Sequence, residues 1–333
     1  MRLPTHIIAL AAAVLAAFAL SHFSDRIDPY FLDVLTGVGI NVILAVSLNL
    51  VNGYTGQFSL GHAGFMSVGA YVSAAITVLW GPSILGTDGG SAAQQGALFL
   101  AALLAGGLGA AVAGLAVGIP SLRLKGDYLA LVTLGSGEII RVVFQNVDAL
   151  GGALGLNGIP SYTTVFWVYS VAAVTVFTVA CLVQSTYGRG FVATHDDEIA
   201  SEAVGLHTTR YKIVAFVVGA FFAGVAGGLY GHFKLTITPT GFDFTKSIEI
   251  VVMVILGGMG NTVGVILAAV LLTILPELLR SVDQYRMVLY SVLLIALMLA
   301  RPKGLFNFDY AAICARLWRR LQPAGRAGGP GPR

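Results

Sequence analysis

Long stretches without a charged residue constrain this chain more than any other feature of its sequence. Seven such stretches hold 212 of the 333 residues, at positions 3–24, 34–87, 89–122, 149–188, 213–233, 250–276 and 287–300. A helix that crosses the hydrocarbon core of a bilayer needs about 20 mainly apolar residues, and six of the seven stretches reach that length. Only 11% of the residues are charged, compared with about 25% in soluble domains. The sequence therefore predicts a polytopic membrane protein and argues against a soluble enzyme.

The distribution of apolar residues predicts an all-α transmembrane bundle of about ten spans, with a range of eight to ten. We expect the spans at residues 7–23, 30–51, 60–80, 96–120, 128–147, 162–183, 213–232, 247–258, 262–279 and 287–300. Only helices and closed barrels can cross lipid, and spans of this length without period-2 alternation exclude a barrel. Residues 1–23 also fit a secretory signal peptide, although we treat them as an uncleaved first span.

The basic residues predict which span ends face the cytoplasm. With the N-terminus inside, thirteen Lys and Arg residues fall on the cytoplasmic side and five on the outer side, which is the usual asymmetry. Residues 1–306 are then the membrane domain, and residues 307–333 are a basic, poorly ordered cytoplasmic tail. A re-entrant segment at 247–258 would place that tail outside, and its basic residues argue against this.

Glycine marks both close packing and breaks. Small residues recur at every fourth position at 106, 110, 114 and 118 and at 219, 223, 227 and 231, a spacing that lets helices approach closely. Three uncharged segments, 52–57, 151–158 and 257–261, interrupt apolar sequence. We interpret them either as broken helices on a translocation path or as ordinary interfacial turns. The glycines expected at the breaks are Gly53, Gly56, Gly152, Gly257, Gly258 and Gly260.

No motif supports catalysis. The chain lacks the patterns G-x-x-x-x-G-K-[ST], H-E-x-x-H and C-x-x-C, and its six histidines are dispersed. Cys181 and Cys314 make neither a disulfide framework nor a metal cluster. We expect no catalytic residue, no metal site and no cofactor bound by this chain. If ATP drives transport, a partner chain hydrolyses it.

A few charges fall within or at the ends of predicted spans. Glu138 and Arg141 stand three residues apart on one helix face, and an unpaired charge in hydrocarbon would cost several kcal/mol. The pair is either a gate or substrate contact, or a structural ion pair. Glu249, Glu277 and Arg280 are interpreted as marking bilayer edges, with a functional role as the alternative.

The loop at residues 184–212 is the one internal segment with dense mixed charge. Its residues 196–205 predict a short amphipathic helix, with acidic residues in the first turn, where the helix dipole favours them. Ala200, Ala203 and Val204 form its apolar side, and Gly205 ends it. Such a helix outside the membrane could bind a soluble partner, or it could be a solvated connector.

Four ordered motifs resemble the branched-chain amino acid ABC transporter permease family, and within it most closely the LivM type. The motifs are G-Y-T-G-Q-F-S-L-G-H-A-G-F at 53–65, L-V-T-L-G-S-G-E-I-I-R at 131–141, D-E-I-A-S-E-A-V-G at 197–205 and G-G-M-G-N at 257–261. The resemblance runs from about residue 30 to residue 306. It implies a permease in the bacterial inner membrane, with both termini in the cytoplasm.

The resemblance also implies partners and roles. The partners are a homologous LivH-type permease, two cytoplasmic ATPases that carry ATP and Mg, and a periplasmic binding protein, with no nucleic acid. The residues expected to couple to the ATPases are Asp197, Glu198, Glu202, Ala203 and Gly205. Val204 departs from the family pattern, which leaves the detailed contacts open. The residues expected along the translocation path are Tyr54, Gln57, Ser59, His62, Glu138 and Arg141.

Rival functions remain at this point. Relatives of the same architecture carry urea, short amides or other amino acids, so the resemblance leaves the substrate open between these and branched-chain amino acids. An ion-coupled secondary transporter would need coupling carboxylates or histidines within its spans, and Glu138 alone gives thin support. A membrane-embedded enzyme or scaffold would function without partners.

Overall fold

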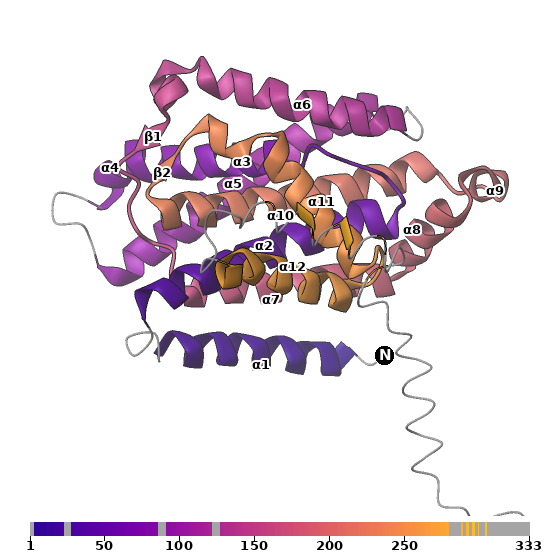
Figure 1. Cartoon of the computed structure of the whole chain (residues 1–333), viewed down its shortest axis with the longest axis horizontal. Coiled ribbons are helices and arrows are strands. Elements are labelled where there is room, and N and C mark those ends of the chain that lie inside the picture. The colour runs from indigo at the N-terminus through magenta and orange to yellow at the C-terminus, as the bar shows by residue number, and fades with distance from the viewer. Residues whose placement is uncertain are drawn as a thin grey trace, which may run out of the picture.

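The computed structural model describes residues 3–22, 28–85, 91–121 and 127–279, together with isolated positions between 288 and 304. Most of the predicted span at 287–300 and the whole tail at 307–333 lie outside the described residues. Long helices run roughly side by side, with α6 along one edge of the bundle and α1 along the opposite edge (Figure 1). The twelve α-helices assigned within the described ranges are α1 (Leu3–His22), α2 (Pro29–Asn49), α3 (His62–Ala75), α4 (Gly81–Leu85), α5 (Ala92–Ser121), α6 (Asp127–Gln145), α7 (Val165–Gln184), α8 (Thr186–Asp196), α9 (Glu198–Ala203), α10 (Thr208–Lys234), α11 (Phe244–Gly257) and α12 (Thr262–Leu278).

Short elements extend or connect these helices. The π-helical segments η2 (Leu50–Tyr54) and η3 (Ile76–Trp80) continue α2 and α3. Three 3-10 turns are η4 (Asp148–Leu150), η5 (Gly152–Leu154) and η6 (Pro239–Phe242). The strands β1 (Leu156–Asn157) and β2 (Thr236–Ile237) pair antiparallel, with Leu156 opposite Ile237.

Polar side chains fix where several helices begin. Asp28 accepts a hydrogen bond from the Tyr30 amide at the start of α2, where Pro29 supplies a suitable backbone angle. Asp243 caps α11 through the Lys246 amide at 3.0 Å, and Asn261 caps α12 through the Gly264 amide at 3.1 Å. These caps satisfy backbone donors that lipid could not.

The bundle has two distinct ends. At one end, which we call the α9 end, lie α8, α9 and the beginning of α1 (Figure 1). At the other, the hairpin end, β1 pairs with β2. The α9 end also holds Gly304. A Cβ atom on Gly304 would lie only 2.6 Å from the Gly258 Cα atom.

Helix α10 is the centre of the core and packs against α3 and α5. A Cβ atom on Gly69 would lie 2.0 Å from the Gly224 carbonyl oxygen, and one on Gly106 would lie 2.7 Å from the Gly69 oxygen. A Cβ atom on Gly227 would lie 1.9 Å from the Met66 oxygen. The close helix packing predicted from the small-residue spacing is therefore confirmed.

Six of the described helical segments are long and apolar enough to cross a membrane: Pro29–Tyr54, His62–Ile84, Ala92–Ser121, Tyr128–Gln145, Val165–Gln184 and Thr208–Lys234. Leu10–Ser21 and Thr262–Leu278 are shorter apolar helices. At the eighth predicted span the structure has α11, whose 14 residues measure only about 21 Å at about 1.5 Å per residue. The fold is thus an all-α, multi-pass bundle, and the count of ten spans stays a prediction.

Candidate functional site

The short helix predicted at 196–205 is present as α9, outside the helix bundle. Asp197 is its N-cap and accepts a hydrogen bond from the Ala200 amide at 3.0 Å. Gly205, with φ +89°, takes the left-handed conformation that follows the helix. This α9 segment lies beyond the long helices, next to α8 (Figure 1).

One side of α9 contacts the rest of the chain, with Glu198 partly buried and Glu202 exposed. Glu198 forms an ion pair with Lys212 on α10, with Oε1 and Nζ 2.7 Å apart. Glu202 accepts a hydrogen bond from the Thr208 hydroxyl at 2.7 Å, and Ser201 donates one to the Ala193 carbonyl at 2.8 Å. These contacts hold α9 in a fixed orientation against α8 and α10.

The apolar side of α9 faces outward. Ile199 is 74% exposed and Val204 is 77% exposed, and Ala200 and Ala203 are exposed as well. Apolar side chains grouped on a short exposed helix are typical of a surface that another protein covers. The sequence pattern identified two sides of this helix, and the structure adds which side is free.

The first and third predicted helix breaks meet at the α9 end. The Gly260 amide donates to Asn49 Oδ1 at 2.9 Å, and the hydroxyls of Tyr54 and Thr262 are 2.8 Å apart. At Gly53 a Cβ atom would lie 2.3 Å from the Gly260 nitrogen, so only glycine fits. Residues more than 200 positions apart in sequence thus form one contact.

The remaining glycines at these breaks fit the same region. Gly56, with φ +68°, lies against His195 of α8, and Gly258, with φ +92°, follows the end of α11. Gly257 packs against the Val265 backbone of α12. The α9 end therefore brings α8, η2 and the α11–α12 turn together.

The second predicted break lies elsewhere. Gly152, with φ +54°, is in η5 at the hairpin end. At Gly155 a Cβ atom would lie 2.1 Å from the Ile237 carbonyl oxygen. This segment forms a turn that leads into the β1–β2 pair, which matches the interpretation as an ordinary connection.

Of the predicted path residues after Tyr54, Gln57 and Ser59 are buried in the non-helical segment between η2 and α3, and the buried His62 is the first residue of α3. Ser59 and Asn52 bond reciprocally, through the Ser59 amide at 3.2 Å and the Asn52 Nδ2 at 3.4 Å. Gln57 donates to Thr55 Oγ1 at 2.9 Å, and His62 Nε2 is 2.9 Å from the Ser47 hydroxyl oxygen. The assignment of these residues to a translocation path remains a prediction.

Helices α3 and α11 begin close to each other, α3 at a buried position and α11 at an exposed one. The Ala63 amide, in the first turn of α3, donates a hydrogen bond to the Ser247 hydroxyl oxygen of α11 at 3.2 Å. Gly64, Asp243 and Glu138 line a small hollow beside this contact. Helix starts of this kind direct their positive dipole ends toward the hollow, as the discontinuous helices of transporters do toward their substrates.

Glu138 and Arg141 pair as predicted, with Oε2 and Nη2 2.6 Å apart and both side chains partly exposed. They lie on α6, whose Tyr128, Leu131 and Ile139 are exposed. The pair therefore sits beside the starts of α3 and α11 on an edge helix. Its geometry is compatible both with a structural role and with a role in the path.

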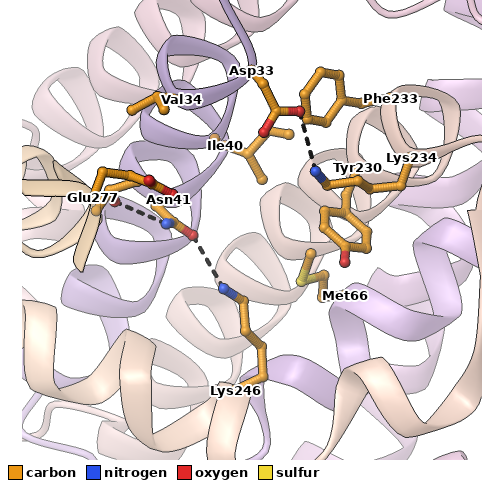
Figure 2. Close-up of a pocket in the computed structure, with 12 residues that line it drawn as sticks. Asp33, Val34, Ile40, Asn41, Met66, Tyr230, Phe233, Lys234, Lys246 and Glu277 are labelled. Atoms are coloured by element: carbon orange, nitrogen blue, oxygen red, sulfur yellow. Dashed lines mark hydrogen bonds and ion pairs between the residues drawn. The ribbon is translucent and has the colours of Figure 1, made fainter. Parts of the chain in front are cut away.

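A polar cavity near the hairpin end was missed by the sequence reasoning. Its wall includes Asp33, Asn41, Lys234, Lys246 and Glu277, whose positions around one space are drawn in Figure 2. Glu277, for which the sequence left open a bilayer-edge position or a functional role, lines this cavity. A residue's place along a span predicts its depth but not which neighbours it faces.

The spanning-length apolar helices define a multi-pass membrane protein. Residues 30–301 match the family model described as "Branched-chain amino acid transport system / permease component". The chain belongs to this family and is of the LivM type.

Curated relatives agree with this assignment. The high-affinity branched-chain amino acid transport system permease protein LivM of Salmonella typhimurium is 36% identical, over 82% of this chain and 69% of the relative. A probable branched-chain amino acid transport permease protein LivM of Methanocaldococcus jannaschii is 26% identical, over 82% of this chain and 92% of the relative. The permease protein LivH of Escherichia coli is 25% identical, over 80% of this chain and 90% of the relative. No solved structure gave a significant match.

Proposed function

We propose that this chain is the translocation subunit of an ATP-driven importer that moves branched-chain amino acids into the cytoplasm. The observation that carries this proposal is α9, a short helix fixed outside the bundle by Glu198–Lys212 with an apolar face left uncovered. A transporter that used only its own spans would have no need of such a surface. In the proposal, a cytoplasmic ATPase covers it.

The orientation of the chain follows from this assignment. The α9 end faces the cytoplasm, and it also holds the start of α1 and Gly304. Tyr30 donates a hydrogen bond to Glu277 near the end of α12, at the opposite end of the bundle. A last crossing between α12 and Gly304 would complete ten spans, with both termini inside. Residues 1–306 would then be the membrane domain and residues 307–333 a cytoplasmic tail.

The mechanism needs a moving bundle. ATP and Mg bound between two partner ATPase subunits would draw these subunits together and move α9. Because Lys212 belongs to α10, which is the centre of the core, the movement would pass from Glu198 directly into the helix that packs against α3 and α5. A homologous LivH-type permease would complete the path, and a periplasmic binding protein would deliver the substrate.

A branched-chain amino acid suits the internal geometry. A zwitterion can be held by helix starts and backbone carbonyls without a net charge on the wall. The starts of α3 and α11 bring their positive dipole ends beside the hollow that Glu138 lines. The names of the LivM and LivH relatives point to the same substrate class. Urea, short amides and other amino acids are the alternative cargoes, and ion-coupled transport by this chain alone is the alternative mechanism.

Reconstitution tests the proposal. The chain is placed in proteoliposomes alone or with its permease partner, ATPases and binding protein, and uptake of labelled leucine and urea is followed. ATP-dependent accumulation of leucine by the full assembly alone is the expected result. Uptake of urea in place of leucine would show that urea, and not a branched-chain amino acid, is the substrate. Uphill uptake by the isolated chain under an ion gradient would contradict the mechanism.

A further inference from the structure

The cavity near the hairpin end lies between α2, α3, α10, α11 and α12. Its volume is about 150 Å³ and it is open on one side. Cavities of roughly this volume hold a molecule as large as benzene, so an open cavity of this size suits a small organic molecule. Figure 2 shows charged and apolar side chains from different helices directed around the same space.

A cation lies in the deep part of this cavity. The Lys246 side chain is only 22% exposed, and its Nζ donates to Glu249 Oε2 at 2.9 Å and to Asn41 Oδ1 at 3.4 Å. Asn41 is itself fixed by a 2.9 Å hydrogen bond to Thr273. Within the described part of the chain, these contacts use two of the three N–H donors of Lys246. The third donor is available to a bound anionic group.

Two carboxylates lie across the cavity from different helices. Asp33 Oδ1 accepts from Lys234 Nζ at 3.2 Å, and both side chains are well exposed at the opening. Glu277 accepts from the Tyr30 hydroxyl through Oε2. Each of these contacts uses one oxygen of a carboxylate that has two, so each carboxylate can also accept a hydrogen bond from an ammonium group.

The remaining wall is apolar. Val34 and Ile40 on α2, Met66 on α3, and Tyr230 and Phe233 on α10 line the cavity. An aliphatic side chain placed here would leave water and contact these groups, which stabilises binding by roughly 25 cal/mol per Å² of buried apolar surface. A methionine and two aromatic rings adapt well to branched aliphatic groups.

We propose that this cavity is a binding site for a zwitterionic amino acid with a branched aliphatic side chain, a proposal that rests on the proposed function. Lys246 takes the carboxylate, Asp33 and Glu277 take the ammonium group, and the apolar wall takes the side chain. An inorganic anion would meet the two carboxylates, and a metal cation would meet the two lysines. A molecule with both charges and an apolar part is complementary to all three features of the wall.

Binding to the assembled transporter tests this site. The complex of the permeases and ATPases, without the binding protein, is placed in nanodiscs, and binding of labelled L-leucine is measured. Lys246→Met is compared with Thr245→Val, a change at the neighbouring exposed position on α11. We expect Lys246→Met to weaken leucine binding by about ten-fold to a hundred-fold, because a charge-assisted hydrogen bond is lost. We expect the control to bind as the wild type does.

A second variant changes shape without changing charge. At Gly37, which lines the cavity, a Cβ atom would meet nothing closer than Thr273 Cγ2 at 3.9 Å. Gly37→Val should therefore fold and fill part of the cavity, and it should weaken binding of L-leucine more than that of L-alanine. As competitors of leucine, 4-methylpentanoate, which lacks the ammonium group, and isoamylamine, which lacks the carboxylate, should each be at least about ten-fold weaker.

The outcomes separate the site from the function. If the full assembly accumulates leucine with ATP but Lys246→Met and Gly37→Val bind leucine as Thr245→Val does, the site is wrong and the proposed function stands. If the wild-type complex transports leucine but does not bind it in nanodiscs, the proposed site is also wrong. If the wild-type assembly does not accumulate leucine at all, the proposed function itself fails.

Discussion

Lys212 Nζ lies 2.7 Å from Glu198 Oε1, and this ion pair joins the exposed helix α9 to the central helix α10. The Lys212 side chain is only 10% exposed, so its charge has little contact with solvent. Together with the 2.7 Å hydrogen bond from Thr208 to Glu202, the pair directly connects the proposed docking surface to the core helix. It gives the coupling proposal a specific mechanical link.

Removal of the Glu198 charge should loosen this link. In Glu198→Gln a nearly buried lysine loses its counter-charge, at a local cost of about 1–3 kcal/mol. We expect ATP hydrolysis by the assembly to continue while leucine uptake per ATP falls. The measurement is the ratio of uptake to hydrolysis in proteoliposomes. The reversed pair, Glu198→Lys with Lys212→Glu, should recover part of that ratio, and a Glu198→Gln variant with a normal ratio would rule out the link.

The exposed apolar side of α9 should supply most of the binding energy between this chain and the ATPase. Val204→Asp places a charge where an apolar contact is expected, and loss of one central interface contact costs about 2 kcal/mol or more. Copurification of the ATPase subunits with the tagged chain should drop by at least ten-fold. Thr209→Asp, a polar exposed position outside α9, is the matched control. Equal recovery of ATPase with both variants would exclude this surface from docking.

Glu202 should act through its charge as well as its position. It accepts from Thr208 at 2.7 Å, and Glu202→Gln can keep that hydrogen bond whereas Glu202→Lys reverses the charge. We expect Glu202→Lys to uncouple hydrolysis from uptake while the chain still inserts, and Glu202→Gln to have a much smaller effect. Uptake assays combined with quantification of the chain in membranes measure both properties. Unchanged uptake in Glu202→Lys would remove Glu202 from the coupling site.

The contact between the two breaks should tolerate no side chain. Gly53→Ala would place Cβ 2.3 Å from the Gly260 backbone nitrogen, whereas Gly135→Ala has no atom within 4 Å. We expect Gly53→Ala to destabilise the protein by several kcal/mol, as overpacking against backbone does. Gly135→Ala on α6 should be neutral or stabilising by up to about 1 kcal/mol. Thermal unfolding in detergent compares the two, and equal midpoints would show that the breaks do not touch.

Local features of the chain were predictable from sequence, and long-range features were not. Charge-free stretches predicted the long helices because lipid requires them. The acidic residues of the first turn and Gly205 predicted α9 because such end signals act within a few residues. The meeting of Gly53 with Gly260 depends on how two distant helices pack, which no local pattern encodes.

The cavity was unpredictable for the same reason. Lys246, Glu277 and Asp33 each fell near the end of a predicted span, where charges are common. Sequence position gave their approximate depth, but the packing of α2, α11 and α12 turned them toward one space. The orientation of α9 was unpredictable in the same way. The sequence distinguished an acidic and an apolar side of this helix, but only the structure shows that the apolar side faces outward.

The most direct test of the central claim, that an ATPase grips this chain through α9 on the cytoplasmic side, is the accessibility of a single cysteine at Val204. In a Cys181→Ser, Cys314→Ser background, Val204→Cys is treated with a membrane-impermeant maleimide in right-side-out and inside-out vesicles. The account predicts labelling only in inside-out vesicles, with protection when the ATPase subunits are bound. Labelling in right-side-out vesicles, or labelling that bound ATPase leaves unchanged, would contradict it.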